Sequence, residues 1–118
     1  MHSYKELKVW QKSLDLVVAV YKATANYPKD ERFSLIVQTQ RSAVSIPSNI
    51  AEGAGRNHDK EFVQFLAIAN GSCFELETQI LVAEKLNFIS HEISNDICAR
   101  LNEIQKMNYN FQQKLINK

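Results

Sequence analysis

The stretch between Phe33 and Ala51 constrains the fold most, because Arg41 is its only ionisable side chain. A helix turns by about 100° per residue, so a helix through this stretch would be apolar around most of its circumference. Such a helix is normally enclosed by others. The remaining arc, about 100° wide, is polar and contains Gln38, Arg41, Ser42, Ser45, Asn49 and Glu52.

Unpaired polar groups are costly to bury, so this polar arc should meet partners on a neighbouring helix. Ser72, Glu75 and Gln79 follow one another at spacings of three and four, which places them on one helix face. We therefore expect Ser72 and Glu75 to join the arc in a polar network. Arg41 is expected to neutralise Glu52 or Glu75 within it.

A first helix is expected near the start of the sequence. Ser3 is a suitable N-cap, and the helix would run to about Asn26, because the residue before Pro28 resists the helical region. Its apolar side chains recur at helical spacing and are Leu7, Trp10, Leu14, Val17, Val18 and Tyr21.

The second helix contains the nearly uncharged stretch. It would begin at Asp30 and Glu31, since acidic side chains suit a helix N-terminus, and end at Gly53-Ala54-Gly55. Pro47 lies inside it, where proline removes a backbone donor and usually kinks a helix. One kinked helix is the preferred interpretation. The alternative is that Ser45 caps a new short helix that begins near Pro47.

Two more helices complete the chain. The third would begin at Asp59-Lys60-Glu61 and run to Lys85 or Leu86. Gly71 in its middle costs about 1 kcal/mol relative to alanine, so we expect a close neighbouring helix there. Ser90 is a good N-cap for the fourth helix. Its apolar residues repeat at three and four and are Ile93, Ile97, Leu101, Ile104, Met107, Phe111 and Leu115.

These patterns predict an all-α fold, an antiparallel up-down-up-down four-helix bundle. The chain has 118 residues and is 45% hydrophobic, which suits a single domain over residues 1–118. Only 3 Gly and 2 Pro are present, which favours long helices over sheets with many tight turns.

The charge balance argues against a generally basic nucleic-acid binder, because the net charge is only +1. Phosphate contacts would depend on local clusters, for which the candidates are Lys5, Lys8, Lys12, Arg56 and Lys60. A solvated helix face is the plainer interpretation of the first three. We find no signal-peptide pattern and no membrane-spanning run, so a cytoplasmic protein with reduced thiols is expected.

No catalytic residue, metal or cofactor is predicted. A di-metal site in a bundle uses Glu-x-x-His on two helices, and no acidic residue here has a histidine three positions later. The two cysteines, Cys73 and Cys98, fit no zinc spacing. Glu52 and Glu75 could form a carboxylate pair for acid–base chemistry. Their place in a polar network with Arg41 is the preferred interpretation.

Several motifs together resemble the bacterial four helix bundle protein family, also known as the S23 or 23S rRNA intervening-sequence protein. The resemblance spans nearly the whole chain. The matching segments are Leu7-x-Val9-Trp10-Gln11, Tyr27-Pro28, Gln38-x-x-Arg41, Ser45-Ile46-Pro47-x-Asn49-Ile50-Ala51-Glu52-Gly53 and Ala69-x-Gly71-Ser72-x-x-Glu75-Leu76-Glu77.

The resemblance implies an antiparallel bundle that assembles into a ring-like homopentamer and has no enzymatic activity. Members are encoded inside intervening sequences of large-subunit ribosomal RNA genes. Relatives include the accessory variability determinant of diversity-generating retroelements, a basic pentamer that binds nucleic acid and a reverse transcriptase. The first hypothesis is thus a non-enzymatic homo-oligomer that binds RNA or DNA as an accessory factor. The alternative is a protein-interaction scaffold that binds no nucleic acid.

Overall fold

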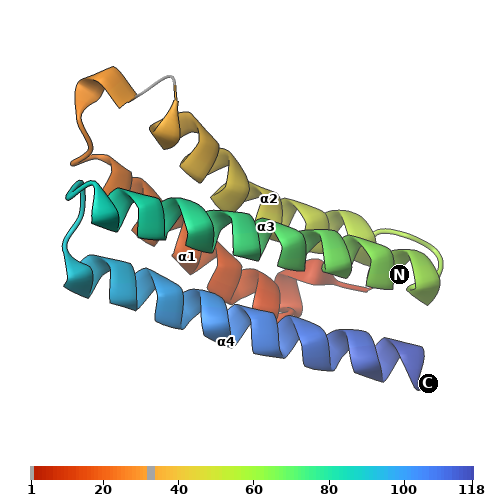
Figure 1. The fold of residues 1–118 in the computed structure, drawn as a ribbon. Coiled ribbons are helices and arrows are strands. Elements are labelled where there is room, and N and C mark those ends of the chain that lie inside the picture. Colours follow the sequence, from red (N-terminus) through yellow and green to blue (C-terminus); the bar gives the residue numbers. More distant parts are fainter. Residues whose placement is uncertain (1, 32–33) are drawn as a thin grey trace.

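Four long helices dominate the computed structural model, which describes residues 2–31 and 34–118 (Figure 1). The elements are η1 (Tyr4–Glu6), α1 (Lys8–Thr24), η2 (Lys29–Glu31), α2 (Leu35–Ala54), α3 (Asp59–Lys85) and α4 (His91–Ile116), where η marks a 3-10 turn. The described ranges contain no strand. The predicted all-α four-helix bundle is confirmed.

Each helix packs against the next in the sequence, and α4 packs back against α1. The contact between α2 and α3 is the most extensive, and the contact between α1 and α4 is the least. The bundle measures 46 × 24 × 20 Å. Both termini lie at the end of the bundle that carries the α2–α3 turn (Figure 1).

An apolar core runs along the inside of all four helices. Burying one such side chain stabilises the fold by roughly 1.5–3 kcal/mol. The largest apolar side chains that are fully buried are Phe62, Leu16, Ile46, Ile50, Leu66, Leu76, Ile80, Ile97, Leu101, Ile104 and Val20.

Asn108 of α4 is fully buried within this core. Its Nδ2 donates to the carbonyl oxygen of Leu66 at 3.0 Å and to Oδ1 of Asn70 at 3.1 Å, both on α3. Its Oδ1 accepts from Gln112 at 3.3 Å. Sliding α4 by one turn along α3 would leave a buried amide without partners, which is costly. Asn108 therefore fixes the axial register of these two helices.

Two helix starts differ from the sequence expectation. The first helix begins at Lys8 rather than after Ser3, whose side chain makes no capping bond. Residues Tyr4–Glu6 instead form η1, in which the Tyr4 ring packs edge-on against Trp10, with ring centroids 5.1 Å apart.

The expected cap of the fourth helix at Ser90 is confirmed, because its hydroxyl oxygen accepts from the N–H of Ile93 at 3.1 Å.

The second helix begins later than expected but is continuous. Asp30 and Glu31 belong to η2, and α2 begins at Leu35, while residues 32 and 33 lie outside the described residues. A helix start at Asp30 is therefore wrong. The helix then runs unbroken through the buried Pro47, which confirms one helix rather than two.

The buried face of α1 differs from the apolar spacing seen in the sequence. The helix buries Val9, Leu16 and Val20, whereas Val18 and Tyr21 are exposed. Helix α1 therefore has two apolar sides. One faces the core, and the other, which carries Val18 and Tyr21, is exposed.

The prediction that a neighbouring helix packs closely against Gly71 is wrong within the chain. Gly71 is exposed, and a Cβ added there would meet no atom within 4 Å. The close approach occurs at Gly53 instead, where an added Cβ would lie 2.7 Å from Cδ1 of Phe62 and 2.7 Å from Cβ of Phe65. Glycine at this position lets the first turns of α3 fold back onto the end of α2.

We predict that Gly53→Ala lowers the free energy of unfolding by about 1–3 kcal/mol, because the methyl group overpacks against Phe62 and Phe65. Gly55→Ala is the matched control, since its added Cβ would meet only carbonyl oxygens of its own helix at 3.6 and 3.7 Å. Its change should stay within about 0.5 kcal/mol. Urea unfolding measures both. Equal losses in the two variants would contradict the close contact.

Candidate interaction surfaces

The polar arc of α2 meets α3 at one pair of hydroxyl groups, those of Ser45 and Ser72, and we call this contact the α2–α3 seam. The hydroxyl oxygens of Ser45 and Ser72 lie 2.7 Å apart. The Asn49 side-chain amide donates to the carbonyl oxygen of Ser45 at 2.8 Å and to its hydroxyl oxygen at 2.9 Å. The Ser45 hydroxyl oxygen thus accepts from Asn49, and either serine can donate the proton of the bond between Ser45 and Ser72. The structure thus brings together three of the eight expected network residues, and Ser42 is buried nearby on α2.

The other four expected members take no part in these bonds and are exposed; they are Gln38, Arg41, Glu52 and Glu75. Among the described residues no ion pair includes Arg41, and Glu52 lies 3.5 Å from Arg56 instead. The expected neutralisation of a carboxylate by Arg41 is therefore wrong within one chain. The polar arc is wider than the α2–α3 seam, so only one edge of it is covered.

The structure does not bring Glu52 and Glu75 together for acid–base chemistry. Glu52 is seven residues beyond Ser45, and Glu75 is three residues beyond Ser72 on the antiparallel helix. At 1.5 Å per residue, the two carboxylates are separated by about 15 Å along the bundle.

Four of the five candidate phosphate-binding residues lie in the half of the bundle that carries the α2–α3 turn, while Lys12 lies opposite Glu103 near the middle of α4. The segment before α1 is held beside the α2–α3 turn, because the N–H of His2 donates to the carbonyl oxygen of Ala54 at 2.9 Å. This segment and the start of α1 carry Lys5, Lys8 and Lys12, and the turn and the start of α3 carry Arg56 and Lys60.

Two of these five residues are partly neutralised by carboxylates. Lys12 lies 2.6 Å from Glu103. Arg56 lies 3.5 Å from Glu52 and 3.7 Å from Glu61, and its guanidinium is 4.9 Å from the centre of the Phe65 ring. Lys5, Lys8 and Lys60 are exposed, and no ion pair between described residues includes them.

A cluster beside the α2–α3 turn was not expected from the sequence. Asp59 accepts a hydrogen bond from Lys118 Nζ at 2.7 Å, and its other carboxylate oxygen lies 3.3 Å from His2 Nε2. The bonds from Lys118 and then His2 lower the pKa of Asp59. The His2 ring also packs against Phe62 and Phe111, with centroids 5.0 and 6.2 Å away. These contacts join residues far apart in the sequence, so no local sequence pattern predicts them.

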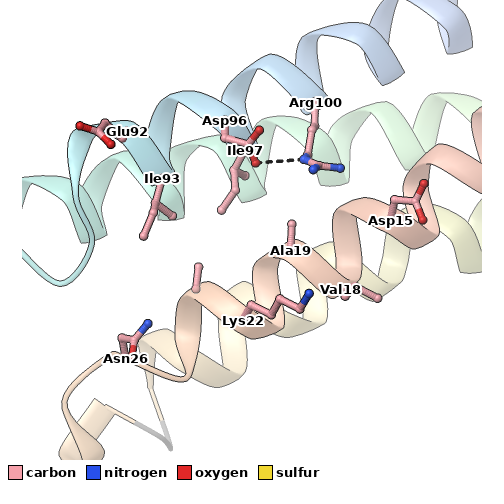
Figure 2. A pocket seen from close by; sticks show the side chains of 11 residues that line it. Asp15, Val18, Ala19, Lys22, Asn26, Glu92, Ile93, Asp96, Ile97 and Arg100 are labelled. Carbon is pink, nitrogen blue, oxygen red and sulfur yellow. Dashed lines mark hydrogen bonds and ion pairs between the residues drawn. The ribbon is translucent and has the colours of Figure 1, made fainter.

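A groove of about 800 Å³ runs between α1 and α4 (Figure 2). Val18, Ala19, Ile93 and Ile97 contribute its apolar part. Its charged residues include Asp96 and Arg100, which bond each other at 3.0 Å on the same helix, as Figure 2 shows. The groove can accommodate an apolar surface.

The described residues offer little for covalent or metal chemistry. No group of three or more His, Cys, Asp or Glu side chains among them could hold a metal ion. Burial raises the pKa of the Cys73 thiol to about 12 and also raises that of Cys98, so neither is an activated nucleophile. Both ring nitrogens of His91 are hydrogen-bonded: Nδ1 lies 2.8 Å from Oε2 of Glu84, and Nε2 lies 3.0 Å from Nδ2 of Asn95.

None of the helices in the described ranges combines the length and apolar character needed to cross a membrane.

A family model described as 23S rRNA-intervening sequence protein matches residues 5–110. This chain belongs to that family. The family match covers all four helices except the last residues of α4. No curated protein matches the sequence significantly.

This family member is also similar to a solved structure. The crystal structure, at 1.70 Å resolution, is of a protein of unknown function from the S23 ribosomal protein family of Bacteroides thetaiotaomicron VPI-5482. The two sequences are 27% identical, and the TM-score is 0.79 over 88% of this chain and 97% of the other. The resemblance seen in the sequence motifs is thereby confirmed.

We predict that Ser72→Ala lowers the free energy of unfolding by about 1 kcal/mol, the usual contribution of one internal hydrogen bond. Ser72 is 5% exposed and bonds Ser45 across the seam. Ser48→Ala is the control, since Ser48 lies on the exposed side of the same stretch of α2, and it should change stability by less than about 0.5 kcal/mol. If the two variants unfold at the same urea concentration, the hydrogen bond between Ser45 and Ser72 does not stabilise the fold as predicted.

We predict that Asp59→Asn lowers the thermal midpoint at neutral pH by loosening His2 and Lys118. The pKa of Asp59 is lowered in the folded chain, so its stabilising effect is present above the ordinary carboxyl pKa. That effect is lost as the pH falls through the lowered value. The difference between variant and parent chain should therefore vanish in acid, as scanning calorimetry over a pH series would show. A difference that persists in acid would mean that the Asp59 charge is not its source.

Proposed function

We propose that this chain is a non-enzymatic, self-associating bundle that binds RNA or DNA as a cytoplasmic accessory factor. The observation that carries the proposal is that Lys5, Lys8 and Lys60, in the half of the bundle that carries the α2–α3 turn, are exposed and outside the ion pairs of the described residues. Phosphate groups are the natural partners of such side chains. The family description, which refers to an intervening sequence of 23S rRNA, points to RNA as the first nucleic acid to test.

Self-association is part of the proposal because three lysines bind nucleic acid weakly. Each neutralised phosphate adds a separate salt-dependent contribution to binding, so several copies in one assembly multiply the contacts. The exposed apolar side chains support such an assembly; Phe74 and Ile68 on α3 are 59% and 53% exposed. We take the number of copies to be five, as the family resemblance implies.

A protein-interaction scaffold is the second candidate. It is favoured by the net charge of +1 and by the carboxylates that already pair Lys12 and Arg56. The same exposed apolar surface would then serve another protein, such as a reverse transcriptase. The binding experiment below separates the two candidates.

We predict that Lys5→Gln/Lys8→Gln weakens RNA binding and lowers the slope of log Kd against log salt by about one to two per bound chain. Filter binding to structured RNA, titrated against salt, measures this slope. Lys29→Gln/Lys85→Gln is the matched control with the same loss of charge. These two lysines flank the connections at the opposite end, where the Tyr27 and Phe88 rings lie 5.5 Å apart.

The control variant should bind RNA and DNA as the parent chain does. No binding by the parent chain to either nucleic acid at low salt would overturn the nucleic-acid half of the proposal. Nuclease-insensitive capture of one defined protein from lysate would then support the scaffold.

A further inference from the structure

The outer face of α3 is apolar along the middle of the helix. Phe74, Ile68, Leu81 and Val82 are 59, 53, 45 and 41% exposed, and Ala67, Gly71 and Thr78 are exposed on the same side of the helix. Between Gln64 and Lys85, Glu75 is the only exposed residue of this helix that carries a charge. A helix that is apolar on its core side and on its outer side is normally covered on both. We call this outer surface the α3 ridge.

A second apolar surface lies over α1 and α2. Val18 and Tyr21 of α1 are 53 and 45% exposed, and Val44 of α2 is 40% exposed. Tyr21 borders two hollows here. One, of about 480 Å³, is also lined by Val37, Arg41 and Val44, and the other, of about 490 Å³, by Val17, Val18 and Ala25. We call this surface the α1–α2 groove.

The two surfaces are complementary in charge. Arg41 is the only ionisable residue of α2 before Glu52, and it lines the groove. Glu75 is the only exposed charged residue in the middle of the ridge. The groove therefore presents the positive charges of Arg41 and Lys22, which lines its second hollow, and the ridge presents the negative charge of Glu75. Such an arrangement selects a matching partner, because a wrong partner would leave a charge unpaired.

The two charges also lie at the same height in the bundle. The bond between Ser45 and Ser72 marks one level that α2 and α3 share. Arg41 is four residues before Ser45, and Glu75 is three residues after Ser72 on the antiparallel helix. At 1.5 Å per residue, they lie about 6 Å and about 4.5 Å from that level, in the same direction. Rotation about an axis parallel to the bundle preserves height, so it would bring Arg41 of one copy level with Glu75 of the next.

We propose that the α1–α2 groove holds the α3 ridge of a second copy of this chain, with an ion pair between Arg41 of one copy and Glu75 of the next. This proposal rests on the self-association proposed above and names its two surfaces. Groove and ridge are different parts of the chain, so the contact is head-to-tail and every copy offers one of each. Head-to-tail contacts related by rotation close into rings. Phe74, next to Glu75, enters the hollow beside Tyr21.

The test measures the mass of the full chain in solution against concentration, by sedimentation velocity. We expect Arg41→Glu and Glu75→Arg each to weaken assembly at least about tenfold, because each variant places two like charges in the contact. The double variant Arg41→Glu/Glu75→Arg should recover most of the assembly, because it restores the opposite charges. Circular dichroism confirms that each variant is folded, as exposed residues permit.

The apolar half of the contact has its own matched pair of variants. Phe74→Ala should weaken assembly at least about tenfold, as expected for an aromatic residue central to an interface. Tyr109→Ala on α4 is the control, because Tyr109 is 50% exposed and belongs to neither surface. Arg100→Glu tests the other groove, between α1 and α4, and should leave assembly unchanged.

The outcomes separate this proposal from the one on which it rests. A parent chain that is monomeric at every concentration would overturn self-association and this interface together. A parent assembly that survives both single charge reversals and Phe74→Ala would overturn this interface alone. Assembly lost in the single variants and not regained in the double variant would overturn the ion pair. Nucleic-acid binding is measured separately and does not enter these results.

Discussion

The hydroxyl pair of Ser45 and Ser72 lies on the side of α2 that α3 covers, beside the buried Ile46. Two serines are small enough to let the helices pack closely, and α2–α3 is the most extensive helix contact. Once Ser45 and Asn49 face α3, the geometry of the helix leaves Arg41 on the outside. The bond thus does more than add about 1 kcal/mol of stability. It divides the polar arc into a covered edge and an exposed edge, and the exposed edge is the part available for a partner.

The number and type of helices could be predicted because the apolar residues repeat at three and four. The same spacing also carried a signal that was missed. Continuing from Leu101 and Ile104, the next core position is 108, which holds Asn108, and the structure buries that side chain fully. An asparagine at a core position predicts a buried hydrogen bond, although its partner, the carbonyl oxygen of Leu66, follows only from the packed helices.

The sequence could not show which apolar side of a helix faces its own core. Helix α1 has two such sides, and the apolar spacing seen in the sequence includes Val18 and Tyr21, which the structure leaves exposed. For the same reason, the sequence does not show whether the partner of Arg41 belongs to the same chain. Burial and charge patterns tell that a surface needs covering, but they do not distinguish a neighbouring helix from a neighbouring molecule. The Asp59 cluster was out of reach because it joins His2 and Lys118 across the whole sequence.

The two proposals are compatible because they use different parts of the bundle. Assembly uses the sides of the helices, where Arg41, Phe74 and Glu75 lie near mid-height. Phosphate binding uses exposed lysines in the half of the bundle that carries the α2–α3 turn, which include Lys5, Lys8 and Lys60. In a ring whose axis is parallel to the bundles, the sides of each copy face its neighbours and the ends form two rims. The same end of every copy then lies on the same rim. The weak binding of a few lysines per chain is multiplied there, although the net charge per chain is only +1.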